Sequence, residues 1–278
     1  MKYLQEVWGS RELLFNLTSR EVRGKYKRTI FGQLWSLANP LALMLIYSLV
    51  FGVLFKSSPP AGNPSGIDVF PLWLLCGLLP WIFFSTVVSS SAASLVDNSN
   101  LIQKVSFSRI VLPLSTVGAS AYNWLFEMAV LLIALTIAGS FVLPWLPLLF
   151  VVMALLAVFA AGVGMLFSIA NVYFRDTQYL LTIVLQLWIY LTPIIYPIER
   201  VAAASVSKGG LFGTPVTILG LYDLNPMVHY VALFRQVLYD NRWPDPAEGL
   251  ICLCWSIGAI AIGMLIFRKN ERNLAETL

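Results

Sequence analysis

The stretch LPLLFVVMALLAVFAAGVGMLFSIA, from Leu146 to Ala170, decides the class of fold. It contains no Asp, Glu, Lys or Arg. A helix needs about 20 predominantly apolar residues to cross the hydrocarbon core of a bilayer. A helix also satisfies its own backbone hydrogen bonds, as a lipid environment requires. The stretch is therefore predicted to be a transmembrane helix.

The composition of the whole chain indicates the same environment. Of its 278 residues, 58% are hydrophobic and 12% are charged, and the mean hydropathy is +0.78. A soluble domain is nearer half apolar and a quarter charged. We therefore expect a single transmembrane domain, residues 1–278, without a separate soluble domain.

Five further segments are apolar and long enough to be spans, so we expect an all-α integral membrane fold with six transmembrane helices. Residues 31–196 would hold spans one to five, and residues 249–278 the last span and a cytoplasmic tail. The six predicted spans are Leu34–Phe55, Phe70–Val96, Val111–Ala138, Leu146–Ala170, Tyr179–Tyr196 and Leu250–Phe267.

Two segments outside the spans have patterns of their own. Apolar residues in Met1–Arg23 fall near one helical face, which predicts an amphipathic interface helix within a cytoplasmic segment, residues 1–30. A soluble helix packed on a partner is the alternative.

Polar residues interrupt the apolar middle of residues 197–248, at Gly220–Tyr239. We expect re-entrant helices there on the outer side, beside protein or a water-filled cavity.

The basic residues predict the orientation. Most of the 18 Lys and Arg residues lie before the first span, between spans two and three, between four and five, or after the sixth. Loops rich in Lys and Arg stay in the cytoplasm. Both termini of this multi-pass protein are therefore predicted to be cytoplasmic, in the plasma membrane (the inner membrane of a Gram-negative cell). The basic residues then face membrane lipids, and no nucleic-acid partner is expected.

The motifs of nucleotide and metal chemistry are missing. Around Gly24 and Lys25, Ser19 replaces the first glycine of a phosphate-binding loop and Tyr26 replaces its Ser or Thr. The chain has one histidine, His229, which is too few for a histidine-rich metal site. We expect no catalytic, cofactor or metal-binding residues here, so that ATP and Mg²⁺ would be bound by a partner subunit.

Glu127 is the carboxylate that lies well inside a predicted span, and Asn123 precedes it by about one helical turn. A hydrogen bond between helices is the structural interpretation of this intramembrane polar pair. A carboxylate that lines a transport path is the alternative. An ion-coupled transporter would carry more ionisable residues within its spans, which favours an ATP-driven one.

Four segments, spread over nearly the whole chain, carry recognisable motifs. They are RGKYKRTIFGQLWSLANP (Arg23–Pro40), NSNLIQKVSFSRIVLPL (Asn98–Leu114), NVYFRDTQYLL leading into QLWIYLTPIIYP (Asn171–Pro197) and LNPMVHYVALFR (Leu224–Arg235). Together they resemble the membrane subunits of bacterial ABC exporters of polysaccharides, the ABC type-2 permease superfamily, whose cargoes include O-antigen, capsule, teichoic acid and galactan. In the second segment, Ser108 departs from the proline that is usual in that family.

The resemblance implies a pore made by two copies of the chain and two copies of a separate ABC ATPase subunit. Its cargo would be a lipid-linked glycan moved from the cytoplasm to the outer side. The loop Asn98–Arg109 would be a coupling and gate element at the ATPase. Exposed apolar residues in a short basic loop suit a protein contact, and an ordinary loop on lipid headgroups is the alternative. The candidate coupling residues are Asn98, Asn100, Lys104, Val105, Phe107, Arg109, Arg175 and Asp176.

Aromatic residues suggest a path for such a glycan. Flat rings can slide along the apolar faces of sugars, while Tyr hydroxyls and Trp N–H groups meet sugar hydroxyls. Helix packing or lipid contact is the alternative. The candidate path residues are Tyr47, Phe51 and Phe55, which recur every fourth residue on span one, and Trp188, Tyr190 and Tyr196 in span five and the turn after it.

Other functions compete with polysaccharide export. One is a drug or lipid exporter of the same superfamily. Another is a membrane glycosyltransferase or polymerase, which would need acidic residues near the membrane surface, and no carboxylate cluster occurs in the predicted cytoplasmic loops. A third is an assembly protein without transport. We favour the export permease because it accounts for all four segments.

Overall fold

The structure is a computed structural model that describes residues 9–25, 27, 29–54, 60–105, 107–208, 217–271 and 274. Within these residues the secondary structure is helical and contains no strand. The predicted all-α integral membrane fold is thus confirmed.

Five helices are long and apolar enough to cross a membrane. They are Gly32–Leu54, which joins η1 (Gly32–Leu34), α3 (Trp35–Tyr47) and η2 (Ser48–Leu54); α4 (Phe70–Asp97); α6 (Val111–Ile137); Leu143–Tyr173, which joins η3 (Leu143–Trp145) to α7 (Leu146–Tyr173); and α12 (Pro246–Asn270). The shorter helices are α2 (Arg11–Lys25), α5 (Ser99–Lys104), α8 (Thr177–Trp188), α9 (Ile198–Lys208), α10 (Ile218–Asp223) and α11 (Pro226–Leu238).

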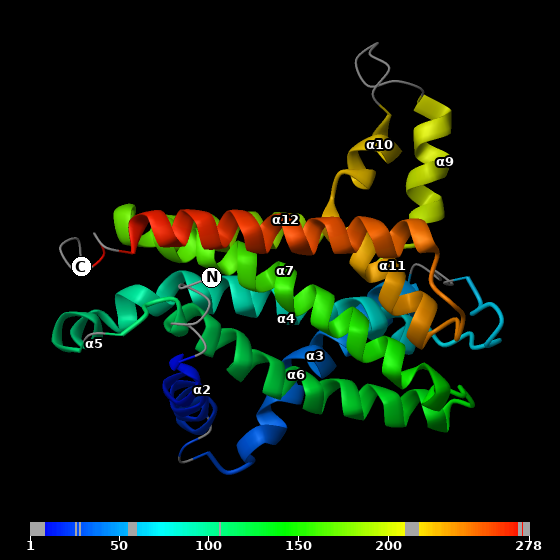
Figure 1. Cartoon of the computed structure of the whole chain (residues 1–278). Helices are drawn as coiled ribbons and strands as arrows, with labels where there is room; N and C mark the ends of the chain where they lie inside the picture. The colour runs from blue at the N-terminus through cyan, green and yellow to red at the C-terminus, as the bar shows by residue number, and fades with distance from the viewer. Residues whose placement is uncertain are drawn as a thin grey trace.

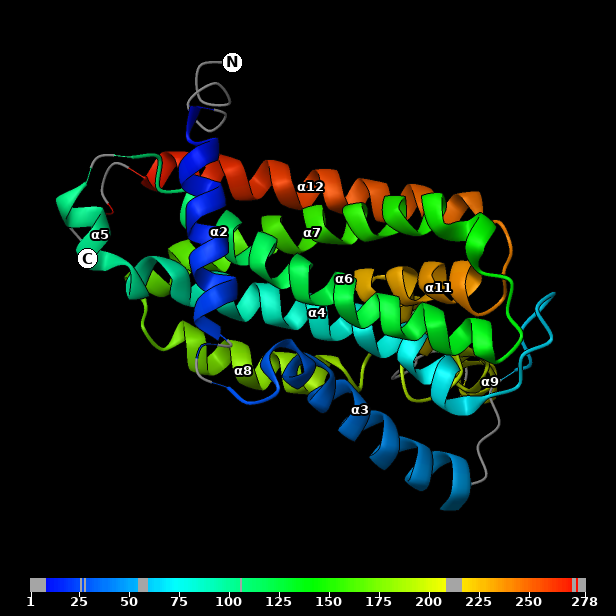
Figure 2. The same ribbon diagram turned by 90° about the horizontal axis from the view of Figure 1, so that it is seen from below.

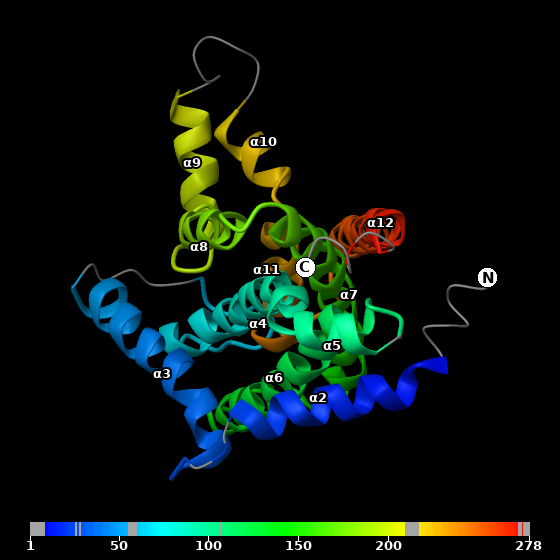
Figure 3. The ribbon, with the colours of Figure 1, turned by 90° about the vertical axis from the view of Figure 1, so that its left-hand side faces the viewer.

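Helix α4 forms the centre of the bundle. It packs against α6, α7 and α11, and α12 lies along the other side of α7 (Figure 1). The apolar window of α4 is 78% buried, whereas that of the first span is 6% buried. Figure 3 shows α3 standing away from the other long helices. The first span therefore presents most of its side chains outward.

Helices α7 and α12 approach closely because glycines face each other. A Cβ atom on Gly162 would lie 2.3 Å from the carbonyl carbon of Ala259, and one on Gly263 would lie 2.6 Å from the carbonyl oxygen of Gly162. Small residues at helix contacts are the usual way to bring membrane helices together, since lipid supplies no hydrophobic drive between them. This contact fixes the position of the last span.

The fifth predicted span differs in the structure. We predicted one helix over Tyr179–Tyr196, but α8 ends at Trp188 and the chain continues in turns to Pro197. Pro193 and Pro197 explain the difference, because a proline lacks a backbone N–H and disfavours helical geometry in the residue before it. At 12 residues, α8 is too short to span a bilayer alone, so the six-span count is not confirmed.

The segment between α8 and α12 forms α9, α10 and α11. Helices α9 and α10 project from the bundle, whereas α11 lies within it beside α4, α7 and α12 (Figure 1). Asn225 caps the start of α11, accepting a hydrogen bond from the backbone N–H of Met227 at 3.0 Å, and Pro226 follows as the first helical residue, where its missing N–H costs nothing. The segment is therefore helical, whereas the predicted re-entrant path on the outer side is not confirmed.

The N-terminal segment forms a helix across one end of the bundle. Helix α2 crosses α6 near the end that carries α5 (Figure 2). Leu17 is buried in that contact and Phe15 is exposed. The helix predicted over Met1–Arg23 is thus present from Arg11, and residues 1–8 lie outside the described residues.

Candidate functional site

The segment that joins α4 to α6 is held at both ends. The guanidinium of Arg20 on α2 donates to Oδ1 of Asn98 at 2.8 Å, and the Asn98 amide donates to the Ser94 carbonyl at 2.9 Å. At the other end, the backbone N–H of Arg109 donates to Oε1 of Glu271 at 2.8 Å, and its guanidinium donates to the Glu271 carbonyl. These contacts tie the segment to α2 and to the residue that follows α12.

Between these anchors the segment presents side chains outward. Ile102 is buried and fixes α5, whereas Val105 is 52% exposed and Lys104 and Asn100 are exposed. Phe107 is partly buried against a small apolar cluster at this end. The turn between α7 and α8, with exposed Arg175 and Asp176, follows α7 at the same end of the bundle. The structure thus gathers the predicted coupling residues, with Asn98 and Arg109 serving also as structural anchors.

Arg235 stabilises the turns at residues 189–197, which follow α8 and are called the break after α8 below. Its guanidinium donates to the carbonyls of Pro193 at 2.6 Å and Ile194 at 2.7 Å, and it lies 3.5 Å over the ring of Trp73 on α4. Turns inside a membrane domain leave carbonyls without a helical partner, and each must be satisfied locally. Arg235 supplies charge-assisted hydrogen bonds to two of them.

Asn225 holds the same break from the other side. Its Oδ1 accepts a hydrogen bond from the Trp188 indole at 2.8 Å, and its amide donates to the Leu191 carbonyl at 3.0 Å and to Oγ1 of Thr192 at 3.1 Å. One residue therefore both caps α11 and fixes the end of α8. The Asn-Pro pair at this position was visible in the sequence as a helix-start signal, but its long-range partners were not.

The candidate path residues separate into two groups. Tyr47 and Phe51 pack edge to face with ring centroids 6.3 Å apart, and Tyr47 lies near enough to Tyr190 for the two side chains to interact electrostatically. Phe55 lies outside the described residues. Span one thus comes near the turn after α8 at Tyr47 and Tyr190, and the role of these rings in a glycan path stays a prediction.

The second group, Trp188 and Tyr196, makes packing contacts and hydrogen bonds within the chain. Trp188 packs against Phe84 with centroids 5.3 Å apart, so its ring belongs partly to the core. The Tyr196 hydroxyl donates to the Tyr190 carbonyl at 2.6 Å and lies 2.7 Å from the Tyr222 hydroxyl. These polar groups thus hold the turn together.

His229 on α11 makes hydrogen bonds to α10 and α12. Its Nδ1 lies 2.6 Å from Oε2 of Glu248 on α12, and its Nε2 lies 2.8 Å from the Asp223 carbonyl. Both partners are acceptors, so an imidazolium donates to both at once. The hydrogen bond to Glu248 is the main cause that raises the pKa of His229 above its usual value. The histidine is thus a polar contact that joins α11 to α10 and α12.

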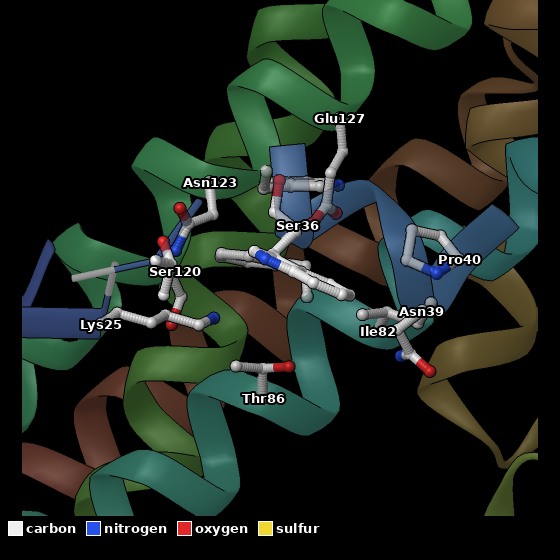
Figure 4. Close-up of a pocket in the computed structure, with 13 residues that line it drawn as sticks. Lys25, Ser36, Asn39, Pro40, Ile82, Thr86, Ser120, Asn123 and Glu127 are labelled. Carbon is white, nitrogen blue, oxygen red and sulfur yellow. The ribbon is translucent and has the colours of Figure 1, made fainter. Parts of the chain in front are cut away.

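Glu127 and Asn123 line a cavity of about 440 Å³ between α3, α4 and α6 (Figure 4). Both side chains are buried. The Asn123 amide donates to the Ala119 carbonyl of its own helix at 3.2 Å. Sequence reasoning placed these two residues on one helical face but missed the other residues of the cavity, which are Lys25, Thr29, Trp35, Ser36, Asn39, Pro40, Ile82, Phe83, Thr86, Ser120 and Trp124.

The comparisons with known proteins agree with this architecture. The chain is 30% identical to the O-antigen export system permease protein RfbA of Myxococcus xanthus over the full length of both chains. It is 26% identical to a protein of the same name from Klebsiella pneumoniae, over 96% of this chain and 95% of that one. It is 25% identical to the polysialic acid transport protein KpsM of Escherichia coli, over 91% of each.

The family profile described as ABC-2 type transporter matches residues 12–239. That match begins in α2 and ends just after α11, so it includes the coupling segment, the cavity and the break after α8. It covers well over half of the chain, and we conclude that the chain belongs to the ABC-2 type transporter family.

Proposed function

We propose that the chain is the membrane-spanning subunit of an ATP-driven exporter that moves a lipid-linked polysaccharide from the cytoplasm to the outer side of the plasma membrane. The observation that carries this proposal is the full-length similarity to a permease whose printed name is O-antigen export. The third relative, named for polysialic acid transport, supports the same class of cargo, a long anionic or neutral glycan.

A separate ABC ATPase would drive transport, binding ATP and Mg²⁺ in two copies. Its docking surface would be the segment that joins α4 to α6, together with the turn between α7 and α8. The exposed residues there are the proposed contacts, and the anchors at Asn98 and Arg109 would pass the movement of α5 to α2 and α12. The end of the bundle that carries α5 also carries the basic residues that predict a cytoplasmic location, so both termini would be cytoplasmic.

A second copy of the chain would complete the pore. The first span is 6% buried, and α8 leaves Ile183, Val184 and Leu187 exposed. A lipid-exposed apolar face needs no partner, but a pore needs a second wall facing the turn after α8. Two copies joined along α3 and α8 would supply that wall.

The aromatic residues would line the path of the glycan. Tyr47, Phe51 and Tyr190 would form one group along this path, with Phe55 proposed as its continuation. Trp188 would offer only its ring, because its N–H is bound to Asn225. Tyr196 would shape the path by holding the turn. Weak repeated contacts suit a moving polymer, since tight binding would stall it.

Reversing the charge of the coupling segment tests the ATPase contact. We expect the double substitution Lys104→Glu and Phe107→Asp to lower the yield of the purified permease–ATPase complex at least tenfold, because it places two negative charges where a protein contact must lose water. The permease alone should elute as a folded protein. Complex yield is measured by co-purification on a tag carried by the ATPase.

The matched control is Lys269→Glu, which reverses a charge at the same end of the bundle but outside the segment. It should leave complex yield within twofold of the parent. If the double variant forms the complex as well as this control does, the proposed docking surface is wrong.

A further inference from the structure

The cavity between α3, α4 and α6 holds polar groups without partners. Among the described residues, Nε1 of Trp124 and Oγ of Ser36 are buried and lack a hydrogen-bond partner, and both residues line this cavity. Trp124 is only 2% exposed. An unpaired polar group is costly in any interior and more so where lipid surrounds the protein. Two such groups at one cavity point to a ligand that pairs with them.

The ring of Trp124 is fixed in place. It stacks on Phe83 of α4 with centroids 4.0 Å apart and an interplanar angle of 11°, and it packs edge to face against Phe234 of α11 with centroids 5.7 Å apart. The indole cannot turn to find another acceptor without breaking both contacts. The indole N–H is therefore a hydrogen-bond donor whose direction is fixed by packing.

The charge of the lining identifies the class of ligand. Lys25 supplies one cation and Glu127 one carboxylate, and the two interact electrostatically. The other polar lining residues are neutral hydroxyls and amides. A phosphate site would present donors and cations without a carboxylate. A balanced set of donors and acceptors instead fits the hydroxyl groups of a sugar or a glycerol, which both donate and accept.

The surroundings of the cavity identify the rest of the ligand. Trp35, Pro40 and Ile82 give the cavity apolar walls, which suit the C–H faces of a polyol. Beside it, Phe31, Leu34 and Trp35 are more than half exposed, so an acyl or prenyl chain could lie along the first span. At about 440 Å³, the cavity has the size of ordinary small-ligand sites, about 300–1,000 Å³.

We propose that this cavity binds the hydroxyl-rich headgroup of a lipid, held by Trp124, Ser36, Lys25 and Glu127, with its tail along α3. Figure 4 shows Lys25 of α2, Ser36 of α3, and Asn123 and Glu127 of α6 around one space. The headgroup has two possible sources: the sugar next to the lipid of the exported glycan, or the glycerol of a bilayer phospholipid. The first source rests on the proposed function, and the site itself does not.

Two conservative substitutions remove the unpaired groups and keep the shape. In Trp124→Phe the ring still stacks on Phe83, and in Ser36→Ala one hydroxyl is lost. The purified complex is placed in nanodiscs that contain phosphatidylglycerol or, as a headgroup without hydroxyls, phosphatidylethanolamine, and retained lipid is counted by native mass spectrometry. We expect the double variant to retain phosphatidylglycerol about tenfold less well, since two net hydrogen bonds are lost.

The matched control changes the same residue types away from the cavity. Ser48 also carries a buried hydroxyl without a partner but does not line the cavity, and Trp243 is exposed. The variant Ser48→Ala with Trp243→Phe should retain phosphatidylglycerol like the parent. Retention that is equal in both double variants, or equal for the two lipids in the parent, overturns the proposal.

A second variant guards against a folding defect. Thr86→Val is nearly isosteric and removes one hydroxyl of the cavity wall on α4. It should lower retention of phosphatidylglycerol several-fold with an unchanged Tm in the absence of lipid. If the Trp124 and Ser36 variant proves unstable, this variant decides, and unchanged retention by it counts against the site.

The bound lipid in complexes from glycan-producing and glycan-free cells distinguishes the two sources. Glycan lipid bound by the parent but not by the cavity variants, with export reduced in the variants, assigns the cargo as the source. Phosphatidylglycerol bound in both kinds of cell, with export unchanged, assigns a bilayer lipid. Failure of the parent to export would contradict the proposed function and leave the binding result standing, whereas the absence of both lipids from the parent contradicts the site.

Discussion

Replacing Arg235 by methionine is expected to abolish export and to lower Tm more than any other single change at the break after α8. Methionine is similar in length but cannot donate to the carbonyls of Pro193 and Ile194. Each lost hydrogen bond to a charged donor is worth about 1.5–3 kcal/mol, and the stacking on Trp73 is lost as well. The break would then hold two unpaired carbonyls inside the membrane domain.

The measurement is thermal unfolding of the purified protein, together with the amount of glycan on the cell surface. The matched control is Arg242→Met, because Arg242 pairs with Asp240 at 3.2 Å on the surface, and exposed pairs contribute about 0–1 kcal/mol. Arg235→Lys should be intermediate, since an ammonium keeps the charge but not the planar fork that reaches two acceptors. Equal Tm and export in the two methionine variants would contradict this role for Arg235.

The substitution Gly162→Ala is expected to destabilise the bundle although it adds one methyl group. Its Cβ would meet the backbone of α12 at Ala259 and Ile260, within 2.5 Å of each, and backbone cannot move aside as a flexible side chain can. Helices α7 and α12 would have to separate over much of their contact. Overpacking of this kind costs about 1–3 kcal/mol, and the last span should detach at a lower temperature.

Gly258→Ala on α12 is the control for helix propensity. Nothing lies within 4 Å of a Cβ atom there, so the change should be neutral or stabilising by about 0.5–1 kcal/mol. The comparison is made by size-exclusion chromatography after heating both variants through a temperature series. A Gly162→Ala variant that survives to the same temperature as Gly258→Ala would show that α7 and α12 are not packed as described.

The sequence predicts most of the long helices because lipid imposes a simple length rule. The prediction of Phe70–Val96 differs from the observed Phe70–Asp97 by one residue, and Val111–Ala138 differs from Val111–Ile137 likewise. The prediction of Tyr179–Tyr196 fails because hydropathy does not register the effect of Pro193, which cannot continue the helix that ends at Trp188. Arg235 stabilises that region through hydrogen bonds to carbonyls about forty residues earlier in the chain. Such distant partners could not be identified from a local sequence pattern.

One part of the candidate site could be predicted from the sequence and another part could not. The position of the segment that joins α4 to α6 was predictable, because it lies between two spans, whereas its contact with an ATPase stays a prediction. The cavity was not predictable, because Lys25, Ser36, Thr86 and Glu127 come from four separate segments and meet only through helix packing. Glu127 alone gave a signal, as a carboxylate within an apolar helix. Trp124 gave none, since an unpaired indole N–H is a property of the packed structure.

The proposal that this chain exports a lipid-linked polysaccharide with an ATPase partner is tested most directly in proteoliposomes. The chain is reconstituted with the ATPase and lipid-linked glycan, and ATP is supplied on the side of α5. Glycan on the opposite side is measured with an impermeant glycosidase. We predict that glycan becomes accessible there only when ATP, the ATPase and this chain are all present. Steady ATP hydrolysis without any accessible glycan, or equal access without ATP, would contradict the proposal.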